Sequence, residues 1–497
     1  MGKIPLTGGA YVARSVLASG QRCVNLYAEP NPEDSEFPFT YYPTAGLTKL
    51  ADPPEPVIGR GLFLSSQGGL YGVVGTGVYS ISSTWVYTLL GRIADLTTPV
   101  SFSDNGLTGV LVDGTNSGYT IDLTTHAFAP IVDPNFFGGN KTDLLDGFLL
   151  FNKPGTNVFY STLFSQITPF DPLYFAAKAG YPDPIVSLIV VHRELWLFGS
   201  LTTEVWSDVG AAQFPFQPIP GVFIQHGCAA RYSVATWDLS VFFISQDKAG
   251  TPMVMEGISY NAVRISTFAI EYEFSKYPTI SDAIGFIYQQ QGHTFYQLTF
   301  PTADKTWTYD ITTKLWHEKV SLDLNGHEHR TRANCGVFAF GVNLVADWQN
   351  GTLYKLDPEN YTENGKPVLR RRIFPHIAND GKRVRYNRFA AQMEVGTAEG
   401  IMPLVTSDFN LDFNNDFGLD LANFPDFPFV SLRWSFTKGK TFGNAILQSL
   451  GATGEFLTQP QWRRLGLGRD VVFDLFWTVN AEVVLQGAWI DFEQSES

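Results

Sequence analysis

A short strand pair recurs along the chain, and its spacing constrains the fold more than any other sequence feature. The clearest copy runs from Val190 to Gly210, where two apolar runs flank a polar turn at Gly199 to Thr203. β-Branched and aromatic residues around such a turn are typical of a β-hairpin. In each copy an aromatic or methionine residue marks the second strand: Tyr79, Tyr119, Tyr160, Trp206, Met255, Tyr309 and Tyr354.

Successive marks are 40, 41, 46, 49, 54 and 45 residues apart. A period of roughly 40 to 50 residues in a chain of strands is typical of β-propeller blades, which bury their faces only by stacking on one another. The WD and kelch dipeptide patterns are missing, so we predict an all-β chain with a divergent propeller of six or seven blades. Two stacked β-sandwiches would give similar strand spacing and remain the alternative. We expect helix only as one turn between Ile258 and Tyr277.

The chain of 497 residues is too long for one ordinary core and predicts two or three domains. We place an extended N-terminal strap at 1–50, with one strand at Cys23 to Tyr27, and the propeller at 51–357. Residues 358–497 predict a C-terminal β-sandwich-like domain with an inserted Asp/Phe loop at 407–428. Its expected strands are 388–395, 403–406, 430–436 and 462–467, followed by a hairpin of 471–479 with 482–492.

Charged residues make up only 16% of the chain and aromatic residues 14%, against about a quarter charged in a typical soluble domain. This composition favours either an aromatic-rich β core or a surface covered by other subunits. The formal net charge of −14 disfavours a protein that grips DNA by its phosphates. Three scattered cysteines encode no disulfide framework. No signal peptide or membrane helix is indicated, so we expect an unanchored protein assembled in a reducing cytosol.

No residue set spells out a reaction, and we predict no catalytic, cofactor-binding or metal-binding residues. His317, His327 and His329 lack the partners of a zinc site. The pair His226 and Cys228 has no third orienting group. No pair of carboxylates stands out for a propeller glycosidase.

Two segments are candidate interaction surfaces. In the loop at 407–428, Asp412, Asn414, Asp416 and Asp420 could offer oxygen ligands to calcium, but the order of an EF-hand is absent and an interaction loop with Phe anchors is favoured. A basic cluster at 370–388 could contact DNA phosphates, pair with acidic patches of a partner subunit, or form a solvated hairpin face. The candidate partner interface comprises Arg370, Arg371, Arg372, Arg383, Arg385, Phe409, Phe413 and Phe417.

Several segments, in order along the chain, resemble the packaged-DNA stabilisation proteins, which are the tail hub or nozzle subunits of short-tailed double-stranded DNA bacteriophages. The opening Cys-Val-Asn-Leu-Tyr-Ala-Glu-Pro from Cys23 and the segment from Tyr42 to Lys49 are similar to that family's start. The hairpin from Leu195 to Trp206 resembles its central signature, with the continuation from Ile224 to Ala230. The segment from Trp462 to Arg469 and the hairpin after it resemble its end, whereas the insert at 407–428 departs from the pattern.

The resemblance implies a structural virion protein without enzymatic activity: a homo-hexameric ring in the tail, below the portal and its adaptor. Such a ring would close the channel after packaging, retain the genome and conduct it during ejection. It would carry tail spikes or fibres, accept a needle or plug protein, and let double-stranded DNA pass without sequence-specific binding. We expect assembly in the host cytoplasm and no cofactor. The alternatives are a receptor- or glycan-binding propeller of the particle surface and, less favoured, a propeller glycosidase.

Overall fold

The computed structural model describes residues 2–4, 6, 8–211, 213–396, 428–451 and 454–494. The chain divides into two compact units. The first, here called the propeller unit, comprises Thr48–Lys314 and His327–Leu356. The second, the sandwich unit, comprises Met1–Leu47, Leu315–Gly326 and Asp357–Ser497. The predicted strap at 1–50 is therefore not a separate element, because nearly all of it belongs to the sandwich unit.

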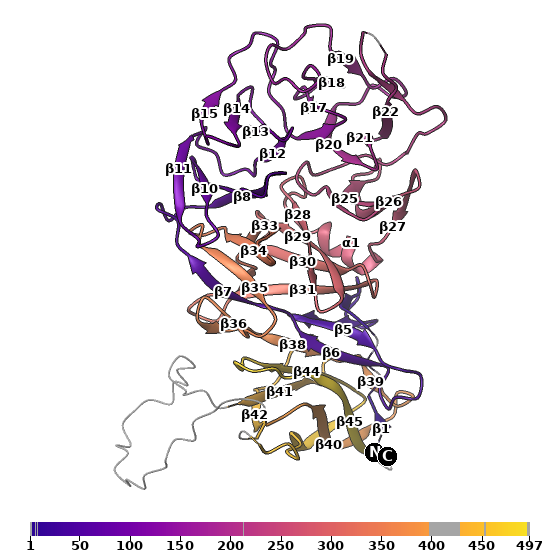
Figure 1. Cartoon of the computed structure of the whole chain (residues 1–497). Coiled ribbons are helices and arrows are strands. Elements are labelled where there is room, and N and C mark those ends of the chain that lie inside the picture. The colour runs from indigo at the N-terminus through magenta and orange to yellow at the C-terminus, as the bar shows by residue number, and fades with distance from the viewer. Residues whose placement is uncertain are drawn as a thin grey trace. The chain divides into compact units, whose positions relative to one another are not determined.

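The propeller unit is a succession of small antiparallel sheets that follow one another around the unit (Figure 1). Five of them have four strands. Blade 1 contains β8 (Gly59–Leu64), β9 (Leu70–Val74), β10 (Gly77–Ile81) and β11 (Tyr87–Arg92); blade 2 contains β12 (Ser101–Asp104), β13 (Thr108–Val112), β14 (Gly118–Asp122) and β15 (Phe128–Pro130); blade 3 contains β16 (Thr142–Leu145), β17 (Phe148–Asn152), β18 (Val158–Ser161) and β19 (Phe175–Ala177). Blade 4 contains β20 (Ile185–Val191), β21 (Glu194–Gly199), β22 (Thr203–Asp208) and β23 (Phe216–Pro218); blade 5 contains β24 (Ala235–Trp237), β25 (Ser240–Gln246), β26 (Pro252–Ile258) and β27 (Asn261–Arg264).

Two more blades complete the unit. Blade 6 is built on β28 (Ile284–Gln290), β29 (His293–Phe300) and β30 (Lys305–Asp310), and blade 7 on β33 (Ala333–Ala339), β34 (Val342–Asp347) and β35 (Leu353–Asp357), with the short β32 (Glu328–Arg330) before it. In blade 7, β35 lies next to β7 (Gly46–Ala51), a strand from near the start of the chain. The pairing of an early strand with the last blade closes the ring of blades. The number of blades, seven, agrees with the predicted six or seven.

The sequence marks occupy equivalent places in the fold. Tyr79, Tyr119, Tyr160, Trp206, Met255, Tyr309 and Tyr354 all lie on the third strand of a blade, from β10 in blade 1 to β35 in blade 7. Six of the seven are buried. Tyr160, Trp206 and Met255 lie in apolar clusters that join their blade to a neighbouring one. The periodicity therefore reflects real blades, and the all-β propeller prediction is confirmed.

Apolar clusters fill the spaces between blades. Leu62, Leu70 and Ile81 of blade 1 pack with Leu344 and Leu353 of blade 7, which closes the ring. Similar clusters join blades 1 and 2, 2 and 3, 3 and 4, and 4 and 5. The helix α1 (Phe268–Phe274) follows blade 5, within the predicted range, and Thr267 caps its N-terminus by accepting a hydrogen bond from Ile270 N–H.

Tight turns set the register of several hairpins. His192 and Arg193, between β20 and β21, both have positive φ values of 56° and 60°. They close the hairpin as a two-residue loop, since Val191 pairs with Glu194. Positive φ at both central positions is the type I′ turn, whose twist matches that of the strands. The opening hairpin of blade 4 is therefore held in one register by its turn.

The sandwich unit contains two sheets, each built from distant parts of the chain. The β40 sheet has the order β43-β40-β45-β6-β5, with β1 beside β45; the β44 sheet has the order β31-β4-β38-β44-β41-β42, with β39 beside β44. The strands are β1 (Gly2–Lys3), β4 (Cys23–Val24), β5 (Leu26–Pro30), β6 (Phe39–Pro43), β31 (Leu315–Leu322), β38 (Arg370–Ile373), β39 (Ile377–Ala378), β40 (Val384–Met393), β41 (Phe429–Ser435), β42 (Ile446–Ser449), β43 (Gln461–Gly468), β44 (Asp470–Trp477) and β45 (Leu485–Gln494). Small hairpins add β2 (Tyr11–Val12) with β3 (Gly20–Gln21), and β36 (Thr362–Glu363) with β37 (Lys366–Pro367).

The two sheets pack face to face through aromatic side chains. Phe389 of β40 lies with its ring centroid 4.7 Å from that of Phe473 in β44, and 5.4 Å from that of Phe374. Such contacts between facing sheets are typical of a β-sandwich. Every expected strand of this region except 403–406, which lies outside the described residues, corresponds to a strand of the structure.

The predicted terminal hairpin is wrong. β44 pairs with β38 and β41 in one sheet, whereas β45 pairs with β40 and β6 in the other. The chain between them therefore crosses from one layer to the next. Both strands are apolar on their inner faces, so alternation alone could not show which sheet each one joins.

The strand expected at Cys23 to Tyr27 is split at Asn25, which has a positive φ of 52°. The buried Asn25 side chain donates to Val320 O at 2.8 Å and to Leu369 O at 2.7 Å, and accepts from Val320 N–H at 3.0 Å. This break allows β4 and β5 to enter different sheets. Among the described residues, no helix is long and apolar enough to cross a membrane.

Candidate functional site

Buried polar side chains cross each of the seven interfaces between blades. We call this set the polar belt. Its side chains bond with the backbone of a neighbouring blade or of the segment leading into it. The bonds are Arg60 Nε to Thr98 O (2.8 Å), Thr142 N to Ser101 Oγ (3.2 Å), Asn152 Nδ2 to Ile185 O (3.4 Å), Ser187 Oγ to Arg231 O (2.9 Å), Tyr296 OH to Ser233 O (2.6 Å), Gln297 Nε2 to Ala333 O (3.4 Å) and Asn334 Nδ2 to Gly59 O (2.8 Å).

The polar belt fixes neighbouring blades in angle and register. An apolar cluster attracts two sheets without direction, whereas a hydrogen bond is satisfied in one geometry only. Placing a charged side chain at such a position removes it from water. Arg60 is fully buried, and burial lowers the pKa of its guanidinium. Its Nη1 donates to Gly75 O at 2.8 Å and to Ala94 O at 3.0 Å. The side chain thereby holds the exit of blade 1 against the segment that enters blade 2.

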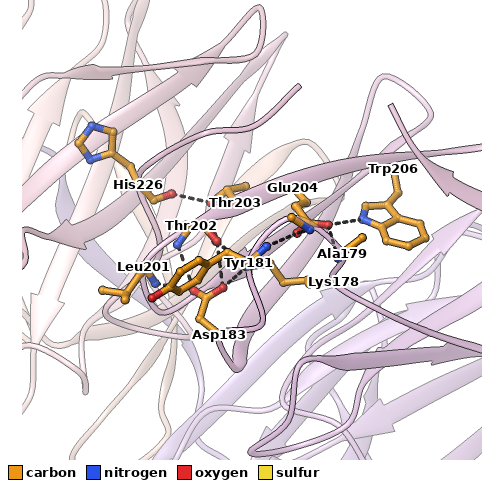
Figure 2. A network of polar contacts seen from close by, with 11 residues as sticks. Lys178, Ala179, Tyr181, Asp183, Leu201, Thr202, Thr203, Glu204, Trp206 and His226 are labelled. Carbon is orange, nitrogen blue, oxygen red and sulfur yellow. Dashed lines mark hydrogen bonds and ion pairs between the residues drawn. The ribbon is translucent and has the colours of Figure 1, made fainter. Parts of the chain in front are cut away.

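A cluster of buried polar groups joins blades 3 and 4 at the central hairpin, and we call it the blade 3–4 latch (Figure 2). Lys178, directly after β19, lies with Nζ 2.5 Å from Asp183 Oδ1, and both side chains are almost completely buried. The ammonium also donates to Thr202 O and Thr202 Oγ1, each at 2.9 Å. All three of its hydrogens therefore have acceptors, as a buried lysine requires.

Asp183 is equally saturated. Its Oδ2 accepts the backbone N–H groups of Leu201 at 2.6 Å and Thr202 at 3.1 Å, and its Oδ1 accepts the Thr202 hydroxyl at 2.9 Å. Burial by itself would raise the pKa of Asp183, but the hydrogen bonds from Lys178 and Leu201 leave it below its ordinary value. The carboxylate thus ties the linker before β20 to the turn between β21 and β22.

Glu204 forms the second half of the blade 3–4 latch (Figure 2). Its buried carboxylate accepts the backbone N–H groups of Ala179 at 3.1 Å, Gly180 at 2.9 Å and Tyr181 at 3.4 Å. The indole N–H of Trp206, one of the sequence marks, donates to it at 3.2 Å. Four donors occupy the two oxygens, so this carboxylate anchors backbone and has no lone pair left for a proton transfer or a cation.

A shallow groove lies beside the latch. It has a volume of about 540 Å³ and is lined by Pro218 to Phe223 together with Ala179, Gly180 and Glu204. Its lining is largely apolar, and its one carboxylate is saturated by donors of the protein itself. The groove therefore offers a surface for packing and lacks the paired reactive groups of an active site.

Cys228 and His329, two of the catalytic and metal-binding candidates, have other partners in the structure. Cys228 is buried, and burial raises the pKa of its thiol to about 11, so it is protonated at neutral pH. Its Sγ lies 3.0 Å from Ala230 O. His329 bonds to Asp304 at 2.6 Å. Among the described residues, no group of three or more His, Cys, Asp or Glu side chains could hold a metal ion.

The prediction that Arg370 and Arg372 belong to an exposed partner interface is wrong. Both are fully buried on β38, the central strand of the β44 sheet. Arg372 donates to Gly9 O at 3.1 Å and to Gln21 Oε1 at 2.9 Å, and its guanidinium lies 4.9 Å from the ring centroid of Tyr41. The density of charged residues in the sequence suggested that these arginines are exposed. The pairing of β38 with β4 and β44 instead turns the side chains of Arg370 and Arg372 inward.

The other interface candidates divide into three groups. Arg371 is largely buried and forms an ion pair with Asp474 at 3.3 Å, whereas Arg383 and Arg385 are exposed on and beside β40. Phe409, Phe413 and Phe417 lie outside the described residues, as do the calcium candidates Asp412, Asn414, Asp416 and Asp420. The interface assignment stays a prediction for the exposed arginines and the phenylalanines.

The sequence pattern marks Trp206 only as a repeat position. It does not indicate the charged members of the latch, which are Lys178, Asp183 and Glu204. The available signal was the polar triple from Thr202 to Glu204, which interrupts a strand pair that is otherwise apolar. Three polar residues at a buried hairpin end require partners. The partners themselves, about 20 residues earlier, could not be read from the sequence.

Comparison with protein families gives a match over residues 2–361, to the family described as Bacteriophage P22 Gp10, beta-propeller. The chain belongs to this family. The match covers all seven blades and the N-terminal strands of the sandwich unit. This P22 Gp10 family member is accordingly a bacteriophage structural tail protein of the DNA-stabilisation family, which confirms the resemblance drawn from the sequence and indicates a virion protein.

Solved structures similar to the family member include a streptogramin B lyase (TM-score 0.43, 10% identity, 63% of this chain and 97% of that chain). They also include the WD40 propeller domain of Doa1 (TM-score 0.40, 10% identity, 62% of this chain and 96% of that chain). A comparison with curated proteins finds no match.

Proposed function

We propose that this protein is a non-enzymatic tail hub, or nozzle, that forms a homo-hexameric ring below the portal and its adaptor. The ring closes the channel after packaging, retains the genome and conducts it during ejection. It gives attachment points for tail spikes or fibres and for a needle or plug protein. The observation that carries this proposal is the family match over residues 2–361.

The physical character of the chain supports a mechanical role. Apolar clusters join five pairs of neighbouring blades and the polar belt crosses all seven interfaces, so the propeller resists distortion in both distance and angle. The charged groups of the blade 3–4 latch bond to one another, to backbone groups and to the side chains of Thr202 and Trp206. These properties suit a wall that bears load from packaged DNA.

The charge of the chain supports passage of DNA without binding. The net charge is −14, and carboxylates facing phosphates give no counterion release and hence no grip. All three cysteines are free, which fits assembly in the reducing host cytoplasm before the protein enters the virion.

The test is assembly. The purified full chain is mixed with portal–adaptor complexes that lack a tail, and the products are imaged by electron microscopy. We expect a six-fold density added at the adaptor, and retention of DNA in filled particles. Failure to join the complexes, combined with binding to host-cell polysaccharide or receptor, would overturn the hub and favour a receptor-binding propeller. Hydrolysis of that polysaccharide would favour a glycosidase.

A further inference from the structure

The strand β42 is an edge strand that lacks the features by which proteins usually protect such strands. It ends the path of the β44 sheet, and among the described residues it pairs only with β41. An edge strand presents unpaired backbone groups, and native proteins protect it with charged residues, proline or a bulge. The segment 442–454 contains no charged residue and no proline. The pairing of β42 with β41 has no register shift.

Two further edge strands of the sandwich unit do carry these features. β43 ends the β40 sheet on one side and contains Arg463 and Arg464, and its pairing with β40 includes a register shift. β5 ends the same sheet on the other side and contains Glu29 and Pro30. Of these three edges, β42 is therefore the one whose backbone is open to a further strand.

The hydrogen-bond pattern shows which backbone groups lie on the free side of β42. In an antiparallel strand, alternate residues direct their N–H and C=O groups to opposite sides. Leu450 N–H donates to Pro428 O at 2.7 Å, on the side of β41, so Leu447 and Ser449 direct their backbone groups to the other side. Both residues are exposed. Among the described residues, no hydrogen bond engages these N–H and C=O groups.

This run of residues matches a second copy of itself. The extended part reaches from Ile446 to Leu450, and its centre is Gln448. When two such runs lie antiparallel about a two-fold axis at Gln448, Leu447 of each copy faces Ser449 of the other. Each of these pairs can exchange N–H···O=C bonds in both directions, and the two Gln448 amides can bond to each other.

The charge of the three edges favours a second copy at β42. A two-fold contact places residues of a strand opposite the same residues of its copy, and like charges that face each other across strands are destabilising. β43 would bring its arginines towards the arginines of the other copy, and β5 would do the same with Glu29. β42 brings no charge to such a contact.

We propose that two copies of the free chain pair through β42 in an antiparallel, two-fold contact that joins their β44 sheets. The inference goes beyond the proposed hub. A two-fold contact uses the same surface on both copies and closes at two, so it differs from the contact that repeats around the proposed ring. The pair covers the unprotected edge of a chain that has not yet been assembled, and thereby prevents open-ended pairing with other strands.

The first test changes Leu447 in the full chain. Leu447→Pro removes an N–H that faces away from β41, and Leu447→Lys places like charges close together in the pair. We expect the wild type to dimerise and each variant to weaken dimerisation at least about tenfold, because proline or charge on an edge blocks a further strand. Analytical ultracentrifugation over a range of concentrations measures this. Leu324→Lys, at a leucine that is 85% exposed in the sandwich unit, is the control and should dimerise like the wild type.

Disulfide trapping tests the register. Gln448→Cys places a new thiol at the two-fold axis, so mild oxidation should link two chains. Ala445→Cys, which is also exposed, lies opposite position 451 in this register and should not link. The wild type is the control for the native cysteines, of which Cys23 and Cys228 are buried. Circular dichroism shows whether each variant is folded.

The outcomes separate this contact from the hub. Equal trapping at positions 445 and 448, dimerisation that survives Leu447→Lys, or a wild type that stays monomeric at every concentration would overturn the pair. A monomeric wild type whose Leu447→Lys variant fails to join the particle would instead assign the edge to a strand of another tail protein. Trapping through Gln448→Cys in a chain that does not join the portal–adaptor complex would overturn the hub and leave the pair intact.

Discussion

The two units place their buried polar groups at very different distances along the chain. In the propeller unit most belt contacts join residues in neighbouring blades, as Ser101 and Thr142 do at a separation of 41 residues. In the sandwich unit Arg372 bonds to Gly9 and Arg22, which are 363 and 350 residues away. The propeller is therefore assembled mostly from local repeats, while the sandwich requires both ends of the chain to be present. Long-range pairing of this kind is slow to form and hard to recognise in a sequence.

Two buried cations, Lys178 in the propeller unit and Arg370 in the sandwich unit, differ in how far their hydrogen bonds are satisfied. The blade 3–4 latch surrounds its ions with complementary partners, so Lys178 and Asp183 have every hydrogen bond they need. In the sandwich, Arg370 donates only to Val368 O at 3.2 Å and Val479 O at 3.3 Å, and its Nε and Nη2 have no hydrogen-bond partner among the described residues. It lies 5.3 Å from the ring centroid of Tyr361. Replacing a buried cation whose hydrogen bonds are satisfied should therefore lower the free energy of unfolding. Replacing one with unsatisfied donors should leave it unchanged or raise it.

The largest effect is expected at the latch. Lys178→Met leaves Asp183 buried without its cation, and breaking a buried pair costs about 3–5 kcal/mol. Hydrogen exchange of peptides covering 178–206, together with urea unfolding, measures the loss. Arg193→Met, which breaks an exposed pair with Asp146, is the control and should cost at most about 1 kcal/mol. Equal effects of the two variants would mean that the latch does not stabilise the propeller.

The next effect concerns the sandwich. Arg372→Met removes the donors to Gly9 O and Gln21 Oε1, and methionine supplies no donor in their place. We therefore expect the free energy of unfolding to fall by about 2–4 kcal/mol. Arg370→Met removes a cation whose Nε and Nη2 are unsatisfied, and apolar replacement of such groups is often neutral or stabilising. Urea unfolding of the two variants gives the comparison. An Arg370→Met variant less stable than Arg372→Met would contradict the expectation that Arg372, which donates to three acceptors, stabilises the fold more than Arg370, which donates to two.

A smaller effect is expected in the polar belt. Asn334→Leu leaves the buried Gly59 carbonyl without its donor at the interface between blades 7 and 1. One unsatisfied buried carbonyl costs about 1–3 kcal/mol. Because this interface closes the ring, amide hydrogen exchange in the Asn334→Leu variant should become faster in β8 and β33 and stay unchanged in blade 4. Uniform loosening of all blades would show that the belt does not act interface by interface.

The smallest effect concerns pH. The pKa of Asp183 is lowered in the folded chain, so its contribution is present above its unfolded pKa of about 3.9 and is lost as the pH falls through its lower folded pKa. The stability gap between the wild type and Asp183→Asn should therefore narrow below about pH 4. Thermal unfolding across pH 3 to 7 checks this sign. A gap that widens in acid would mean that the carboxylate is not stabilised by its partners.

Much of the propeller can be predicted from the amino-acid sequence. The marks from Tyr79 to Tyr354 identify third strands in all seven blades. Equivalent positions of the blades have similar surroundings, so they carry similar large side chains. The resemblance to the phage stabilisation family is likewise carried by segments whose order is kept. The latch is only half visible: the sequence shows a polar hairpin end at Thr202 to Glu204 and gives no sign of Lys178 and Asp183.

The sequence by itself determined the elements and their repetition, since alternation, turn residues and the 40 to 54 residue period are local properties of the chain. The tertiary structure alone decided which layer each strand enters. It placed β44 and β45 in different sheets, and it buried Arg370 and Arg372 while leaving Arg383 and Arg385 exposed. The physical reason is that burial depends on contacts between residues hundreds of positions apart, and a local pattern carries no record of them.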